Sequence, residues 1–478
     1  MEMLSIILQN EICEVKMSLS DNYEQNVGLL RESLRVRDNF DCIEKHLCVG
    51  TCDITFFYVD GFVKDGEMQR IMQYLLSLKQ IGDAMSTERI IPYVELSRTK
   101  NVRQIIDSVL AGQSVMLCES FGAEALLIDA RSYPARNTAE PDTDRVMQGA
   151  HDGFVETLIF NTALIRRRIR DERLTMEYHN MGGVSKTDVV LCYMKGIADE
   201  DVLRRVKEKI VSATPDSLTL GYQSLAETLI KDGWLNPFPK IRITERPDAA
   251  ASQVLEGSIL IICDTSPQVM IVPTSIFDYL QQTDDFYFPP LTGTYLRLVR
   301  TLILLVSIVL TPLWYLCVQN ADALPSQLLF LVPESPGALP IIAQLLLAEL
   351  ALDGLKIASM NTPDMLSNSL SIVGALILGD FAVGVGWLCA DVILYMAFVA
   401  IANFAQQNHE LGYAFKFMRV LTLIAVYLFS AWGLLIGAVA FAVLVGTNQT
   451  LLGRKYYLYP LIPFNKAALK RLIFRLKK

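Results

Sequence analysis

The stretch Thr301-Leu-Ile-Leu-Leu-Val-Ser-Ile-Val-Leu-Thr-Pro-Leu-Trp-Tyr-Leu-Cys-Val318 decides the fold class of this chain. It belongs to an uncharged run of 21 residues that ends at Ala321. Two more uncharged runs follow, 18 residues over Val392–His409 and 34 residues over Val420–Gly453. Because about 20 apolar residues cross a hydrocarbon layer of roughly 30 Å, we expect membrane-spanning helices. Three such runs in series argue against the alternative, a buried helical core in a soluble protein.

Charge divides the chain into two parts. The 478 residues are 52% hydrophobic with a formal net charge of −8, which excludes a disordered or collagen-like chain. Residues 1–290 carry 43 acidic and 30 basic side chains, whereas residues 291–478 carry 8 and 13. The last eight basic residues lie between Arg454 and Lys478. The sequence therefore predicts an acidic folded part followed by an apolar part with a basic end.

The number of spans is open. The region Ser369–Phe404 reads as two closely joined spans. As one helix, Phe417–Gly446 would be about 45 Å long, so it is either one tilted helix or a hairpin that turns near Ser430–Gly433. Four prolines between Leu324 and Pro340 exclude a continuous helix and predict a loop or a re-entrant segment. We expect four spans, with six as the alternative.

Flanking charge predicts the orientation. Arg297 and Arg300 precede the first span and the basic residues follow the last, so both flanks are expected in the cytoplasm. We thus expect a cytosolic α/β domain over 1–290, a multi-pass membrane domain over 291–447 and a basic cytosolic tail over 448–478. The tail either anchors the topology only or also lies against anionic lipid.

The first part reads as α/β, and its start shows no cleavable signal peptide, so we expect it inside the cell. A strand–helix unit occurs twice, over 53–80 and 187–210, which predicts two subdomains at about 25–135 and 180–285. A helix over Gly153–Arg173 is expected to link them, within a linker at 145–175. Two further strand pairs are expected at Ser114–Glu119 with Glu124–Asp129, and at Gly257–Cys263 with Gln268–Val272.

Motifs for catalysis are absent from the sequence. It has no Walker loop, GxGxxG, HExxH or GxSxG pattern, and its four histidines are scattered. The nine cysteines form no CxxC pair, which is typical of a reducing compartment, and His46 with Cys48 and Cys52 lacks a second ligand pair. Arg166, Arg167 and Arg168 could bind phosphate, but neighbouring acids favour a salt-bridged helix surface. We expect no enzyme, cofactor, metal or nucleic-acid partner.

A set of segments in fixed order carries a resemblance. It comprises Gly153-Phe-Val-Glu-Thr-Leu-Ile-Phe-Asn161, Ser185-Lys-Thr-Asp-Val-Val190, Asn236-Pro-Phe-Pro239, Thr244-Glu-Arg-Pro-Asp248, Leu255-Glu-Gly257, Ile271-Val-Pro273 and Arg297-Leu-Val-Arg300. From about residue 25 onward the chain resembles the A subunits of bacterial spore germinant receptors, the GerA family. Its end, including Tyr459-Pro-Leu-Ile-Pro-Phe-Asn465, is more similar to the stage V sporulation protein AF branch of that family.

The resemblance implies a protein of the spore inner membrane with both termini in the cytoplasm. It further implies a homo-oligomeric ring, a pentamer, that forms a cation channel opening early in germination. Other spore membrane germination proteins and the lipid bilayer are the implied partners. Because the AF branch lacks dedicated B and C subunits, direct nutrient sensing is not implied. A non-conducting receptor or scaffold is the alternative. A transporter is less favoured, because only one proline-broken segment is evident.

Candidate residues follow from this function. Ionisable groups inside a membrane are costly and often functional, so Asp380 and Asp391 are candidates for an ion path unless both lie in the turn between two spans. Glu349 and Asp353 are weaker candidates, because with Lys356 they share one face of a predicted interfacial helix over Ala338–Ala358.

Two further groups are candidates for packing and coupling. Small residues could pack helices between subunits or within one subunit; these are Ala375, Gly379, Gly384, Gly433 and Gly437. The segment Thr244, Glu245, Arg246, Pro247 and Asp248 could couple the two parts or simply join two strands, and Arg246 is its first choice for a loss of function.

Overall fold

The computed structural model describes residues 18–93, 95–133, 149–230, 233, 235–360, 382–406 and 408–474. The chain divides into two compact units, one from residues 1–231 and 241–273 and the other from residues 232–240 and 274–478. The first unit holds two β-sheets, and the second is helical. The expected order, an α/β part followed by a helical part, is therefore confirmed.

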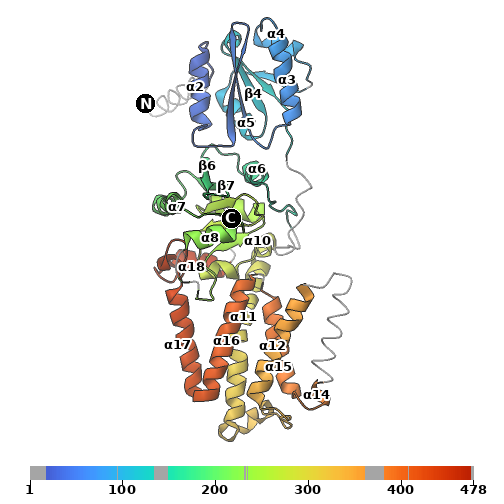
Figure 1. Cartoon of the computed structure of the whole chain (residues 1–478), viewed down its shortest axis with the longest axis vertical. Coiled ribbons are helices and arrows are strands. Elements are labelled where there is room, and N and C mark those ends of the chain that lie inside the picture. The colour runs from blue at the N-terminus through green and yellow to red at the C-terminus, as the bar shows by residue number, and fades with distance from the viewer. Residues whose placement is uncertain are drawn as a thin grey trace, which may run out of the picture. The chain divides into compact units, whose positions relative to one another are not determined.

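The first sheet has five antiparallel strands in the order β1-β2-β4-β5-β3. Its strands are β1 (Cys42–Val49), β2 (Cys52–Val59), β3 (Leu96–Thr99), β4 (Ser114–Cys118) and β5 (Ala125–Ile128). Helices α2 (Tyr23–Ser33) and α5 (Val102–Leu110) cover one face, and α3 (Asp65–Ser77) and α4 (Ala84–Ile90) cover the other (Figure 1). Alternation along β2 explains both layers, because Phe57 faces α5 while Phe56 faces α3.

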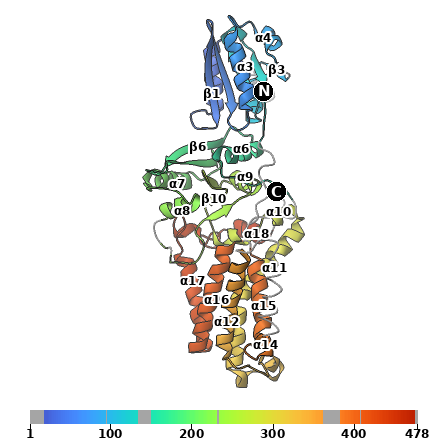
Figure 2. The ribbon, with the colours of Figure 1, turned by 45° about the vertical axis from the view of Figure 1, so that its right-hand side comes forward.

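The second sheet repeats this plan, with the strand order β6-β7-β9-β10-β8. Its strands are β6 (Leu174–Met181), β7 (Thr187–Met194), β8 (Arg242–Thr244), β9 (Ile259–Cys263) and β10 (Val269–Val272). Helices α6 (Leu158–Arg168) and α9 (Pro247–Leu255) lie on one side, and α7 (Glu200–Ser212) and α8 (Tyr222–Leu229) lie on the other (Figure 2). Element by element, the order of helices and strands matches the first sheet.

An asparagine in each half makes the same pair of hydrogen bonds, which extends the repeat to individual side chains. In the first half, the side chain of Asn26 accepts from the amide of Ser20 at 2.8 Å and donates to its carbonyl at 2.6 Å. In the second half, Asn161 makes the same pair of bonds with Val155, at 2.8 and 2.5 Å. Both asparagines are buried and close a loop six residues back, which explains why an amide side chain is needed at these positions.

The predicted linker helix over Gly153–Arg173 is wrong in extent and in role. The helix is only α6, and the eight-residue strand β6, which pattern reasoning missed, follows it directly. Leu164 and Ile165 of α6 pack into the core of the second sheet. The helix therefore belongs to the second subdomain, where it corresponds to α2 in the first. The strand pairs β4–β5 and β9–β10 confirm the two predicted pairs.

A fully buried ion pair joins the two halves of this unit. The guanidinium of Arg166 donates to both carboxylate oxygens of Asp41 at 2.9 Å, and neither side chain has more than 2% exposure. Burial raises the pKa of the flanking thiols of Cys42 and Cys192 to about 12, so they remain neutral. The predicted surface role of Arg166 is therefore wrong.

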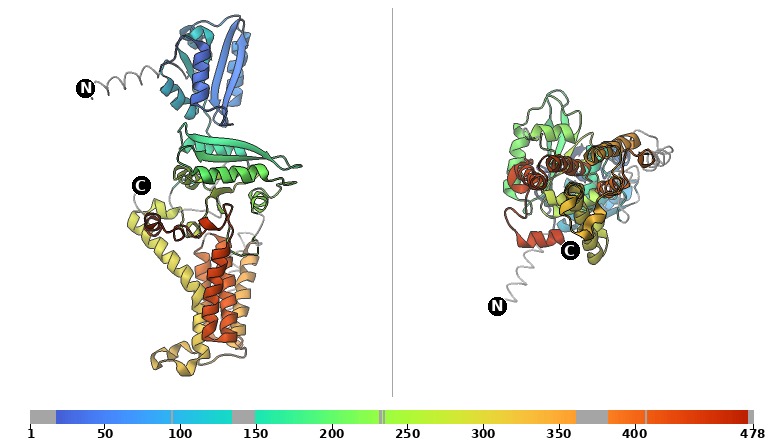
Figure 3. Two further views of the ribbon diagram at one scale, coloured as in Figure 1. Left: turned by 90° about the vertical axis from the view of Figure 1, so that its left-hand side faces the viewer. Right: turned by 90° about the horizontal axis from the view of Figure 1, so that it is seen from below.

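The helical unit contains long, roughly parallel and antiparallel helices (Figure 1). They are α11 (Pro290–Gln319), α12 (Ile341–Met360), α15 (Ala390–Phe404), α16 (His409–Phe429) and α17 (Ala431–Thr447). The short α18 (Lys466–Ile473) lies across one end of them (Figure 3). Two of these helices, α11 and α16, have the length and apolar composition of a membrane span. The apolar helices α15 and α17 are shorter, and α12 carries three charges.

Two open points of topology are resolved. The run after Phe417 is a hairpin, because α16 ends at Phe429 and α17 begins at Ala431. The turn residue Ser430 has φ +51° and ψ −128°, a backbone conformation that is uncommon for a residue with a side chain, at the point where the chain reverses. The proline-rich segment contains only the short 3₁₀ turn η4 (Ser326–Leu331), which follows η3 (Ala321–Ala323), so the predicted absence of a continuous helix there is confirmed.

Replacing Arg166 by Met should destabilise the α/β unit by about 3–5 kcal/mol, because it leaves the carboxylate of Asp41 buried without a counter-charge. Hydrogen exchange of the β1 and α6 amides in the full chain measures the change. The matched control is Arg170→Met, an exposed position on the same segment, which should change protection by less than about 0.5 kcal/mol. Equal protection in both variants would contradict the assigned role.

Candidate functional site

Four charged side chains meet between α12 and α16. Arg419 donates to both carboxylate oxygens of Glu349, at 2.6 Å from Nε and 3.0 Å from Nη2. The ammonium of Lys416 pairs with the carboxylate of Asp353 and donates to the backbone carbonyl of Glu349 at 3.1 Å. We call these four residues the charge cluster. It holds two positive and two negative groups, so it is neutral as a whole.

Helix geometry positions the charge cluster. Glu349 and Asp353 are four residues apart on α12, and Lys416 and Arg419 are three apart on α16, so each pair lies on one helix face. A third helix contributes through its backbone, since Arg419 also donates to the carbonyl of Ser307 on α11 at 3.4 Å. Arg419 is fully buried and Glu349 is 6% exposed.

The predicted interfacial role of Glu349 and Asp353 is therefore corrected. A polar helix face toward water would leave them hydrated, yet Glu349 is buried and both carboxylates have cationic partners. Sequence reasoning missed Lys416 and Arg419. A signal was present, because these are the only basic residues between Lys356 and Arg454.

The other predicted ion-path residues do not join this cluster. Asp391 is partly exposed and lies in the first turn of α15. A carboxylate is stabilising there, because the N-terminus of a helix carries a partial positive charge. This position matches the alternative of a turn between two spans. Asp380, Ala375 and Gly379 lie outside the described residues. Gly384 is exposed, and no heavy atom lies within 4 Å of its would-be Cβ.

Gly433 and Gly437 pack within one chain. A Cβ on Gly433 would lie 2.3 Å from the amide nitrogen of Val426, and one on Gly437 would lie 2.3 Å from Oγ1 of Thr422. Both neighbours belong to α16, so these glycines allow the close approach of α16 and α17. These contacts match the second of the two alternatives for Gly433 and Gly437, packing within one subunit.

The predicted coupling loop proves to be an anchor inside the α/β unit. Arg246 is fully buried, pairs with Asp248 at 2.9 Å, and donates to the carbonyl of Ala150 at 2.7 Å. The Glu245 carbonyl accepts from the amide of Phe154 at 2.8 Å, and Pro247 begins α9. Thr244 ends β8. The loop thus ties β8 and α9 to the segment before α6, which is the structural alternative.

A different segment, residues 236–240, joins the helical unit although the chain on both sides of it belongs to the α/β unit. Phe238 is 1% exposed and packs edge-on against the rings of Phe415 and Phe441, at 6.2 and 5.6 Å. The amide of Asn236 donates to the carbonyl of Leu444 at 2.6 Å. We call this segment the strap.

Two further hydrogen bonds, both with Asn448, hold the other end of the strap. The ammonium of Lys240 donates to Oδ1 of Asn448 at 2.8 Å, and the amide of Asn448 donates back to the carbonyl of Pro239 at 3.0 Å. Burial lowers the pKa of Lys240. The motif Asn236-Pro-Phe-Pro239 therefore packs against α16 and α17 within the helical unit.

A second charged group lies at the start of α11. Asp285 is fully buried and accepts from Arg300 at 3.1 Å and from Arg297 at 3.4 Å. Arg297 also donates to the carbonyl of Leu472 in the last turn of α18, at 2.7 Å. Arg297 therefore connects the first turns of α11 to the end of the C-terminal helix.

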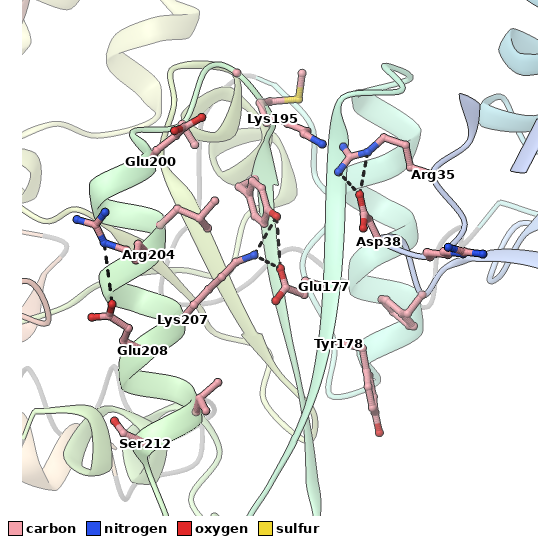
Figure 4. Close-up of a pocket in the computed structure, with 18 residues that line it drawn as sticks. Arg35, Asp38, Glu177, Tyr178, Lys195, Glu200, Arg204, Lys207, Glu208 and Ser212 are labelled. Atoms are coloured by element: carbon pink, nitrogen blue, oxygen red, sulfur yellow. Dashed lines mark hydrogen bonds and ion pairs between the residues drawn. The ribbon is translucent and has the colours of Figure 1, made fainter. Parts of the chain in front are cut away.

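An open cleft of about 1240 Å³ lies in the α/β unit, beside β6 and α7 (Figure 4). At its centre Glu177 contacts His179 at 3.2 Å and pairs with Lys207. These contacts, that of His179 foremost, lower the pKa of Glu177 to about 2 against the opposing effect of burial. Arg35 lines one edge, paired with Asp38. The charges of Glu177, Lys207, Arg35 and Asp38 in the cleft are thus paired within the protein.

No three His, Cys, Asp or Glu side chains are placed to hold a metal ion in the described parts of the chain. Neither the cleft nor the charge cluster presents a nucleophile activated by a base. The arrangement places charged side chains inside an apolar helix bundle. At one end of that bundle, the strap packs against α16 and α17, and Arg297 binds the end of α18.

The sequence model of the Bacillus/Clostridium GerA spore germination protein family matches residues 29–478. The chain belongs to the GerA family. It is 36% identical to the stage V sporulation protein AF of Bacillus subtilis (strain 168), over 97% of this chain and 94% of that protein. It is also 27% identical to the B. subtilis membrane protein YfkQ, over 92% and 85% of the two chains.

Among solved structures, the chain is similar to the N-terminal domain of the A subunit of the Bacillus megaterium spore germinant receptor GerK3. The identity is 25%, the TM-score is 0.41, and the match covers 54% of this chain and 96% of that one. The family model and the similarity to stage V sporulation protein AF confirm the expected resemblance to the GerA family.

In this GerA-family chain, Gly433→Ala and Gly437→Ala should each lower the thermal unfolding midpoint of the purified protein, because the added methyl groups force α17 away from α16. The matched control is Gly446→Ala on the same helix, where nothing lies within 4 Å and alanine should be neutral or stabilise by up to about 1 kcal/mol. A midpoint that is unchanged in the first two variants would contradict the packing role.

Arg419→Met should destabilise the helical unit by about 3–5 kcal/mol, since it leaves the carboxylate of Glu349 unpaired. The double variant Glu349→Gln/Arg419→Met removes both charges and should recover a large part of that loss. Thermal unfolding in detergent measures both. If the double variant is as unstable as the sum of the single variants, the two side chains are not coupled.

Proposed function

We propose that this chain is a subunit of a germination complex in the spore inner membrane, and that it assembles as a ring, a pentamer, to form a cation path early in germination. The observation that carries the channel proposal is the charge cluster. Ionisable groups among apolar helices are costly, and in membrane proteins they mark ion pathways and switches. Family membership supports the germination role and the assembly with other spore membrane germination proteins.

The distribution of charge supports the membrane placement. The described basic residues of the helical unit lie toward the end where α11 begins and α17 ends, or within the charge cluster, and the sequence has none over 301–355, 357–415 or 420–453. The described acids Asp322 and Asp391 lie at the opposite end of α11 and α15. Under the positive-inside rule this distribution supports our proposal that the basic end and both termini lie in the cytoplasm. An even number of spans, four or six, follows.

In this proposal the charge cluster holds the closed arrangement of helices. Each carboxylate already has a cationic partner, so a permeating cation gains little from it. If α12 moves relative to α16, the pairs separate and the two carboxylates become available. Rings of acidic side chains attract cations in channels. A small helix shift could thus change both the width and the charge of the path.

The strap supplies the route by which the α/β unit acts on the helices. It is covalently continuous with β8 on one side, and its Phe238 is buried beside α16, the helix that carries Lys416 and Arg419. A displacement of the strap would be transmitted to α16 through packed rings rather than through a flexible linker.

One observation favours a second candidate, a non-conducting scaffold. The charge cluster is neutral and closely paired, and a purely structural role would need nothing more. Scaffold and channel differ in a single measurable property, which is ion conduction by the assembled protein.

Purified full-length chain reconstituted in liposomes is expected to conduct monovalent cations. Asp380→Asn should reduce conductance or cation selectivity, measured by flux and by the reversal potential in planar bilayers. The matched control is Asp107→Asn, an acid on α5 of the α/β unit, which should leave conduction unchanged.

The assembly state is measured on the same sample by native mass spectrometry. Silent bilayers from a fully assembled ring would reject the channel in favour of the scaffold. If the protein conducts but Asp380→Asn leaves its selectivity unchanged, the channel proposal stands and the ion path does not depend on Asp380.

A further inference from the structure

We infer that the C-terminal segment Leu461–Phe474 is a docking surface for anionic phospholipid headgroups, held in place by Arg297. The inference rests on the membrane placement proposed above and adds a specific partner to it. It is carried by the exposure, the charge and the direction of this segment, and by its link to α11.

The segment exposes apolar side chains that a soluble tail would bury. Ile462 is 62% exposed, Phe464 is 68% exposed and Phe474 is 47% exposed. The first of them, Ile462, comes soon after Tyr457, which is fully buried in the cluster formed by α11, α16, α17 and the strap. The exposed residues therefore start at the end of the apolar helix bundle, continuous with the apolar surfaces that the proposed membrane covers.

Basic residues lie between Phe464 and Phe474 in the sequence. Lys466 and Lys470 are exposed and lie four residues apart on α18, and no acidic residue follows Glu410 in the sequence. A basic amphipathic helix is typical of a membrane surface that carries negative charge. An acidic protein partner could match the charge, but it would not explain why Ile462 and Phe464 are exposed at the edge of the helix bundle.

The direction of α18 fits the plane of a bilayer surface. In the right-hand view of Figure 3, the bundle helices are seen end-on, whereas α18 is seen side-on. A helix that lies on a membrane surface runs across the direction of the helices that span the membrane, as α18 does here. The end of α18 is fixed, because Arg297 donates to the carbonyl of Leu472, and a cation at a helix C-terminus is favourable.

Arg297 also pairs with the buried Asp285, so the docked helix and the start of α11 share one residue. Binding of headgroups to Lys466 and Lys470 would hold α18 at the surface and, through Arg297, the first turns of α11. The composition of the cytoplasmic leaflet would thus influence the helix that contacts the charge cluster through Ser307.

The test compares lipids on the full chain in neutral detergent. Phosphatidylglycerol should raise the thermal unfolding midpoint more than phosphatidylcholine does, and the difference should shrink from about 0.05 M to about 0.5 M salt because the attraction is screened. The variant Lys466→Gln/Lys470→Gln/Arg471→Gln should weaken the apparent affinity for phosphatidylglycerol by on the order of 100-fold, roughly fivefold per basic residue. Ile462→Ser/Phe464→Ser should weaken binding of both lipids.

The matched control is Lys45→Gln/Lys79→Gln, two exposed lysines of the α/β unit, which should behave as wild type. Native mass spectrometry of retained lipid gives a readout that does not depend on the unfolding midpoint. Equal effects of the two lipids on the wild-type chain, or full retention of phosphatidylglycerol by the triple variant, would overturn the inference. So would a loss of oligomers in the triple variant with lipid binding intact, which would make the surface a contact between copies.

Failure here is separable from failure of the proposed channel. A chain that conducts cations without a preference for anionic lipid rejects only the docking surface. A chain that binds phosphatidylglycerol through this segment but never conducts rejects only the channel.

Discussion

The arrangement of the helices in the helical unit depends on the ion pair between Arg419 and Glu349. In an environment with few polar groups, two charges can be buried only when each satisfies the other, and a bidentate arginine–carboxylate pair does so with directed hydrogen bonds. That requirement fixes the height and the rotation of α12 against α16. It also brings α11 to within hydrogen-bond distance of the same guanidinium, at the carbonyl of Ser307. Apolar packing alone would leave these helices free to slide or turn.

The same device recurs wherever segments distant in sequence must be held together. Arg166 and Asp41 join the two halves of the α/β unit, Arg246 ties a loop to the segment before α6, and Arg297 and Arg300 share Asp285 at the start of α11. In each case a buried or nearly buried arginine reaches a partner that lies far from it in the chain or on another element. Arginine suits this role because its planar group offers several donors in a rigid fork.

The duplicated α/β unit shows how one repeat can be adapted to a connecting role. Both halves keep the same order of elements and the same asparagine bracket at Asn26 and Asn161. The halves differ between α8 and β8, where the second half sends out the strap that joins the helical unit. The strap is thus an insertion into a repeat and not one of its core strands. The neighbouring loop at Arg246, a coupling candidate from the sequence, ties β8 and α9 to the segment before α6.

The sequence by itself determined the class of each part. Uncharged runs, alternating strands and the basic end predicted an α/β part, long apolar helices and the strand pairs β4–β5 and β9–β10, because hydrophobic periodicity is a local property of the chain. It left the run after Phe417 undecided between one helix and a hairpin, and it missed β6 behind a basic segment that reads as helix. Only the tertiary structure decided the partners. Glu349 and Arg419 are 70 residues apart, and nothing in either local pattern tells which face of α12 meets which face of α16. That choice depends on packing of whole helices, and it turned a predicted interfacial helix into the charged centre of the bundle.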